Sequence, residues 1–181
     1  PLSLLTLAAC GGGGGGGSAF VSTAGSTSGF AWQGPLNNAL IYIDYDDAAL
    51  GNSASVRTGA DGSYTLSTLN NKYTIVVVTD DTTIDTSSGS VFSGVTMKAR
   101  AGSTAVSTAT TLMEEGGLSV AQVNKVLGLS SDIDHLTFNA FAADANAIDA
   151  LAVEKASKQF FTVVNAFTAA VEGSGASHSD A

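Results

Sequence analysis

A change in the spacing of apolar residues near residue 108 most constrains the fold, because it divides the chain into a β-rich part and a helical part. Before this point apolar residues form short runs between turn residues, and the strongest run, Tyr73–Val78, contains four consecutive aliphatic residues. Such a run predicts a strand that is buried on both faces. After residue 108 the apolar residues recur every three or four positions, as along one face of a helix. We therefore expect a mainly β fold with C-terminal α structure.

The first part is expected to form a small antiparallel β-sandwich over residues 31–107. Short alternating or β-branched runs mark its strands, and Asp61-Gly62 predicts a tight turn between two of them. The expected strands cover residues 40–43, 55–58, 64–66, 73–78 and 91–97. Residues 18–30 are rich in Ser, Thr, Gly and Ala, which is typical either of a linker or of a weak first strand.

The second part, residues 108–172, is expected to contain two short helices and one long helix. The first short helix, over residues 109–115, ends at Gly116-Gly117. Ser119 is a suitable N-cap for the second, which Gly128 closes.

An apolar seam runs along the expected long helix, which covers residues from about 143 to 172. The seam residues recur at alternating spacings of three and four, a pattern that packs one helix face against a partner. They are Val153, Ala156, Phe160, Val163, Phe167 and Ala170. The seam packs either on the chain's own sheet or on a neighbouring subunit, and in the second case the assembly face is Val153, Phe160, Val163 and Phe167. A polar tail, residues 173–181, follows.

The first ten residues are a candidate export and lipidation signal. An apolar run ends at Cys10, which is the one cysteine of the chain, and seven glycines follow it. The run is about half the length that spans a bilayer, and it is typical of the end of a signal peptide. Leu7-Ala8-Ala9-Cys10 resembles the lipobox of bacterial lipoproteins, which implies cleavage before Cys10 and a covalent lipid on its sulfur.

The N-terminal segments follow from this assignment. No initiator methionine or basic segment precedes the apolar run, so we expect residues 1–9 to be the remnant of a signal peptide. Residues 10–30 are then the lipidated cysteine, a flexible poly-Gly tether and a Ser/Thr-rich arm. The resemblance implies an exported protein held to a membrane by its lipid, and Gly11, in place of an aspartate, favours the outer membrane or cell surface.

The charge balance excludes one broad class of function. Asp and Glu total 16 against 7 Lys and Arg, which gives a formal net charge of −9 at pH 7. Proteins that bind nucleic acids use a basic stripe to neutralise phosphates. We therefore expect no nucleic-acid partner.

Short motifs across residues 32 to 170 resemble, in the same order, a module of large bacterial surface and adhesin-like repeat proteins. The motifs are Gly34-Pro35-Leu36, Thr58-Gly59-Ala60-Asp61-Gly62-Ser63-Tyr64, Asp85-Thr86-Ser87-Ser88-Gly89, Phe92-Ser93-Gly94, Thr108-Ala109-Thr110-Thr111-Leu112 and Gly117-Leu118-Ser119. The resemblance implies an extracellular transthyretin-like or Ig-like β-sandwich with a C-terminal helical part, and a role in surface display or adhesion rather than catalysis. Asp80-Asp81 departs from the family's usual Gly pair, and Ala109 from its usual proline.

Two acidic clusters are candidate cation sites. Asp44, Asp46 and Asp47 follow an expected strand, and Asp61 lies in the expected hairpin. Calcium takes six to eight oxygen ligands, so these carboxylates are a candidate Ca²⁺ site, with a solvated acidic loop as the alternative. The second cluster, Asp80, Asp81 and Asp85, has weaker spacing.

Nothing in the sequence predicts a catalytic centre. The chain has two histidines, His135 and His178, which with Cys10 do not make a common zinc site. Asp134 and His135 are residue types that could form an acid–base pair, but the sequence has no G-x-S-x-G motif to supply a nucleophile. We expect a surface loop there.

Three functions remain open. The first is a non-enzymatic cell-surface lipoprotein for adhesion or surface architecture, with a surface protein or glycan as partner. The second is a subunit that assembles into an extracellular filament or coat, with residues 18–30 donating a strand to another copy. The third is an accessory module of an exported enzyme.

Overall fold

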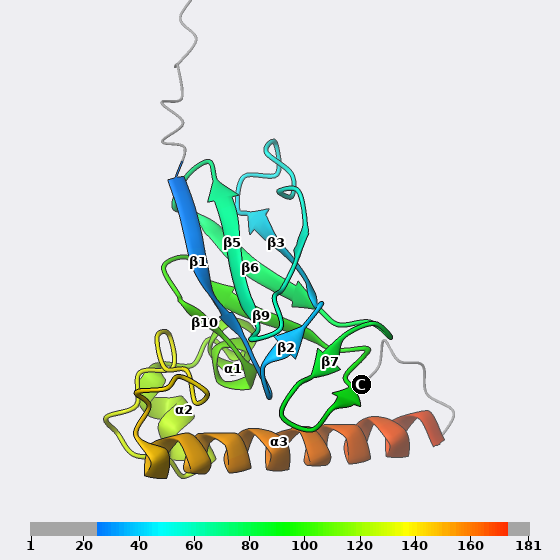
Figure 1. The fold of residues 1–181 in the computed structure, drawn as a ribbon, viewed down its shortest axis with the longest axis vertical. Helices are drawn as coiled ribbons and strands as arrows, with labels where there is room; N and C mark the ends of the chain where they lie inside the picture. The colour runs from blue at the N-terminus through cyan, green and yellow to red at the C-terminus, as the bar shows by residue number, and fades with distance from the viewer. Residues whose placement is uncertain (1–24, 174–181) are drawn as a thin grey trace, which may run out of the picture.

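The structure, a computed structural model, describes residues 25–173, in which strands come first and three helices follow (Figure 1). The strands are β1 (Gly25–Ala31), β2 (Leu36–Asn37), β3 (Leu40–Tyr45), β4 (Val56–Arg57), β5 (Ser63–Thr68), β6 (Tyr73–Val78), β7 (Ile84–Asp85), β8 (Ser90–Val91), β9 (Thr96–Arg100) and β10 (Ala105–Val106). The helices are α1 (Thr108–Gly116), α2 (Val120–Leu127) and α3 (Ala147–Gly173). This order confirms the expected mainly β fold with two short helices and one long helix.

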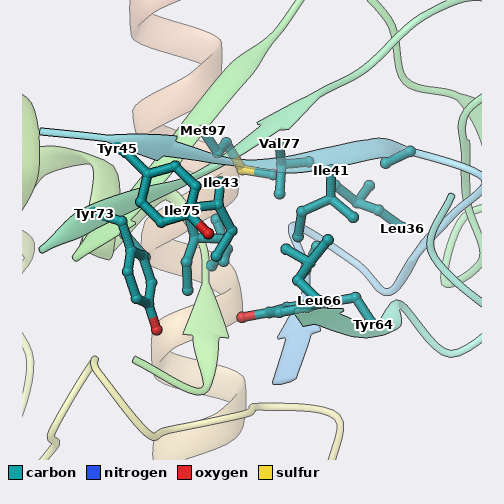
Figure 2. Close-up of a cluster of buried hydrophobic side chains, with 14 residues drawn as sticks. Leu36, Ile41, Ile43, Tyr45, Tyr64, Leu66, Tyr73, Ile75, Val77 and Met97 are labelled. Carbon is teal, nitrogen blue, oxygen red and sulfur yellow. The ribbon is translucent and has the colours of Figure 1, made fainter. Parts of the chain in front are cut away.

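Two sheets face each other across a shared apolar core. One has the strand order β4-β3-β6-β9 and the other β10-β1-β5, while β2, β7 and β8 form a small third sheet. Figure 2 shows Ile43, Ile75 and Met97 of the larger sheet on one side of the core, with Tyr64 and Leu66 of β5 on the other. All five side chains are buried, because alternate residues of each strand point to the same side. The arrangement is sandwich-like.

Strand β6 is buried on both faces, as its unbroken aliphatic run predicts. Ile75 and Val77 point into the core between the sheets, and both are fully buried. Val76 points the opposite way and is also buried. On that outer face the Thr74 hydroxyl donates a hydrogen bond to Glu114 of α1 at 3.2 Å. Helix α1 therefore covers the outer face of the larger sheet.

The pairing is not purely antiparallel, which corrects the expectation. β1 pairs antiparallel with β5 but parallel with β10, so that Phe30 lies opposite Ala105 and Ala31 opposite Val106. A parallel pair needs a long connection, and the chain between β1 and β10 provides it by forming the facing sheet.

The boundaries of both short helices agree with the prediction to within one residue. Ser107 and Ser119 cap α1 and α2 with capping boxes, and the left-handed residues Gly117 and Gly128 end them. The long helix begins at Ala147 rather than near residue 143, because the Asn146 side chain accepts hydrogen bonds from the N–H groups of the first turn.

Two strand assignments also differ. The expected strand over residues 91–97 is split between β8 and β9, because Gly94 has a φ of 75° and turns the chain between them. Of residues 18–30, for which the composition left a linker or a strand open, residues 25–30 belong to β1.

Strand β1 lies so close to the residues before β10 that adding one methyl group at Gly29 is expected to destabilise the fold. A Cβ atom added to Gly29 would lie 2.3 Å from the Thr104 carbonyl oxygen and 2.7 Å from the Tyr64 hydroxyl. Because the nearest atom belongs to the backbone, Gly29→Ala is expected to lower the free energy of unfolding by about 1–3 kcal/mol. Chemical denaturation followed by circular dichroism measures the change, with the exposed Ser26→Ala of the same strand as control. Equal stability of both variants would contradict the prediction.

Candidate functional site

The acidic loop predicted as a calcium site begins where β3 ends. Asp44, Asp46 and Asp47 are all exposed. The Asp47 carboxylate accepts a hydrogen bond from the Ala49 N–H at 3.0 Å, which closes a local turn. The loop has the geometry of a solvated acidic turn.

Asp61 lies at the opposite end of β3 from this loop. Leu40 pairs with Arg57, so the turn that contains Asp61 follows β4 at the beginning of β3, while Asp44, Asp46 and Asp47 lie at its end. Hydrogen bonds from the Ser63 hydroxyl and N–H lower the pKa of Asp61. Within residues 25–173, no three His, Cys, Asp or Glu side chains are grouped so as to hold a metal ion. The structure therefore does not bring the four predicted carboxylates together.

The second acidic cluster has local structural contacts. Hydrogen bonds from the hydroxyl and N–H of Thr82, and then from Arg57, lower the pKa of Asp80 to about 2. The Arg57 guanidinium lies 2.7 Å from its carboxylate. Asp85 is buried in β7 and accepts hydrogen bonds from the N–H and hydroxyl of Ser87, whereas Asp81 is exposed. These contacts order the turns around β7.

His135 is buried, whereas the sequence predicted a surface loop. Its side chain is only 1% exposed, and its Nε2 lies 2.7 Å from the Asn124 Oδ1 of α2. The neighbouring Asp134 carboxylate accepts a hydrogen bond from the Leu136 N–H instead, so no acid–base pair forms. Burial lowers the pKa of His135, and the charge of Asp134 opposes this shift. The histidine joins α2 to the segment before α3.

Two predicted residues, Cys10 and His178, lie outside the part of the chain that the structure describes. The lipidation of Cys10 therefore stays a prediction from the sequence.

The apolar seam of α3 divides into a covered half and an uncovered half. Val153 is fully buried against Trp32 and Ile133, and Ala156 is 8% exposed. Phe160 is half-buried, and Val163 is 67% exposed. The side chain of Phe167 lies outside the described residues. The first half packs on the chain's own core, whereas Val163 of the second half is exposed to solvent.

The seam spacing does not predict Phe161, which makes the main aromatic contact of the second half. Its ring packs edge-on against Phe92, with ring centres 5.4 Å apart. Phe92 belongs to the segment between β8 and β9. The sequence signal for this contact is that Phe161 directly follows Phe160. Two adjacent aromatic residues predict an apolar face of the helix that is wider than the seam alone.

Strand β5 lies at one edge of its sheet, with β1 on its other side. The side chains of Thr65 and Ser67 are exposed, and the strand carries no charge or proline. The second half of the arm predicted to donate a strand, residues 25–30, pairs with β5 of its own chain. The first half, residues 18–24, lies outside the described residues.

Comparison with protein-family models, curated proteins and solved structures finds no match. Among the described residues, no helix is both long enough and apolar enough to cross a membrane.

Proposed function

We propose that this chain is a lipid-anchored surface protein of bacteria that acts in adhesion or surface architecture and not as an enzyme. The observation that carries the proposal is the sequence Leu7-Ala8-Ala9-Cys10 followed directly by seven glycines. An apolar segment, a small-residue site before cysteine and a flexible spacer occur in the order that lipid anchoring requires.

The folded part is compatible with this role. We propose that its facing sheets are a transthyretin-like or Ig-like β-sandwich, which would present loops and helices away from the anchored N-terminus. Strand β1 begins at Gly25 at one end of the sandwich, and α3 lies across the other end (Figure 1). A tether at the N-terminus therefore leaves the helical end farthest from the membrane.

Lipidation is tested by expressing the full chain, behind an initiator methionine and a basic segment, in bacteria fed a labelled fatty acid. We expect the label on the protein and a mature N-terminus at Cys10 by mass spectrometry, and both should be lost in Cys10→Ala. Cys10→Ala removes the only sulfur to which lipid attaches, whereas Ser18→Ala in the same tether is the matched control and should be labelled normally. An unlabelled parent chain, or a labelled Cys10→Ala variant, would refute the anchor.

A second candidate function, self-assembly into a filament or coat, is supported by the uncharged edge of β5. Such an edge accepts the strand of another chain, and a lysine on it blocks this pairing. If copies associate there, light scattering and electron microscopy of the full chain will show oligomers that Ser67→Lys abolishes. Oligomers that persist in this variant would exclude the β5 edge.

A further inference from the structure

A cavity of about 530 Å³ lies between α1, β9 and α3. Val95, which directly precedes β9, Leu112 from α1, and Phe160, Phe161 and Val164 from α3 supply its apolar walls. Its volume falls in the range of about 300–1,000 Å³ that is common for small-molecule sites. The cavity is thus large enough to hold a ligand.

Three of the four polar side chains that line the cavity are paired with other groups of the protein, and the fourth, Thr96, is exposed to solvent. The Thr108 hydroxyl donates to Gln33 Oε1 at 2.8 Å. The Thr111 hydroxyl donates to the Ser107 carbonyl at 2.8 Å and accepts from the Lys98 N–H at 3.0 Å. Glu115 forms an ion pair with Lys98. The remaining lining is apolar, and a hydrocarbon can contact it without needing hydrogen bonds.

The wall that α3 contributes is weakly attached to the rest of the protein, so a ligand could enter beside it. Within the described residues, no hydrogen bond or ion pair joins α3 to another element. The second half of α3 is held by apolar contacts, chiefly the ring of Phe161 against Phe92. Val164 lines the cavity and is still 39% exposed, so it marks the opening to solvent.

We propose that this cavity binds the aliphatic chain of an amphiphile, a fatty acid or a membrane lipid, with the polar head outside the opening at Val164. Burial of the methylene groups against the apolar walls drives binding. The site goes beyond the anchoring proposed above and does not depend on it, because the lining residues named above all belong to the folded part of the chain, residues 25–173.

The experiment titrates the full chain with the neutral fluorescent probe N-phenyl-1-naphthylamine and then displaces the probe with palmitate. Val164→Trp places an indole in the opening and is expected to weaken probe binding by at least about tenfold. Val163→Trp is the matched control, since Val163 is the adjacent residue of α3 and lies outside this cavity. It should bind the probe like the parent chain.

A second filling variant, Thr96→Phe, enters from the β9 wall and should weaken binding in the same way if Val164→Trp does not fold. Displacement by palmitate alone identifies a single-chain ligand, and displacement also by a short-chain diacyl phospholipid identifies a membrane lipid as the source. The proposal is overturned if the parent chain shows no saturable binding, if palmitate displaces nothing, or if the filled variants bind the probe unchanged.

Discussion

Replacing Trp32 by alanine is expected to lower the free energy of unfolding by about 3–5 kcal/mol. Trp32 directly follows β1, and its side chain is 1% exposed. It packs against Ile133 and Val153 and contacts the ring of Phe141 edge-on, with centroids 6.0 Å apart. Truncation therefore removes the largest side chain between the sandwich and α3 and leaves a cavity that the backbone cannot fill.

Chemical denaturation monitored by far-UV circular dichroism measures this loss, because the variant has no other tryptophan to report by fluorescence. Val163→Ala in α3 is the control, since that side chain is 67% exposed and its truncation should change stability by no more than about 0.5 kcal/mol. Hydrogen exchange should also rise in residues 147–157 of the Trp32 variant before it rises in β6. A loss below about 1 kcal/mol would mean that α3 is not held to the sandwich through Trp32.

The elements that could be predicted from the sequence are those whose signals are local. Ser119 and Gly128 bound α2 because a helix cap depends on residues within one turn of it. The aliphatic run of β6 is also a local signal, because it predicts a strand that is buried on both faces whatever its position in the sheet. The parallel pairing of β1 with β10 could not be predicted, because it joins residues far apart in the chain. The apolar pattern of a strand shows which face is buried but not which strand lies beside it.

The same distinction explains the candidate sites. Asp44, Asp46 and Asp47 are close in sequence, so their clustering could be predicted, but the end of β3 near which Asp61 lies depends on the pairing of β3 with β4. The cavity near α3 combines Thr96, Leu112 and Val164 from three elements, and the distances between these residues depend on the fold rather than on the local sequence. The burial of His135 likewise depends on its partner Asn124, which lies on α2.

That partner also fixes the protonation of His135. The Asn124 amide N–H donates to the Ile133 carbonyl at 3.0 Å, so its Oδ1 is the atom that faces His135. The Nε2 of His135 must therefore carry the proton that it donates, and Nδ1 is left with a lone pair that has no partner among the described residues. Protonation of Nδ1 would place a charge in a buried site.

The pKa of His135 consequently lies below 6.5 in the folded chain, while it is near 6.5 in the unfolded chain. Above pH 6.5 His135 is mostly neutral in both the folded and the unfolded chain, so its titration does not change the free energy of unfolding. As the pH falls below 6.5 the unfolded chain binds the proton first, so the free energy of unfolding is lost at up to about 1.4 kcal/mol per pH unit. The loss ends once the pH passes below the folded pKa.

Denaturation curves between about pH 7.5 and 5.5 test this dependence in a range where most carboxylates stay charged. His135→Gln keeps an N–H donor for Asn124 but does not titrate, so its stability should be nearly constant over the range. His178→Gln removes the other histidine of the chain and should keep the slope of the parent protein. If His135→Gln kept the slope and His178→Gln lost it, the tail histidine would be the titrating group. The buried pair with Asn124 would then have no part in acid sensitivity.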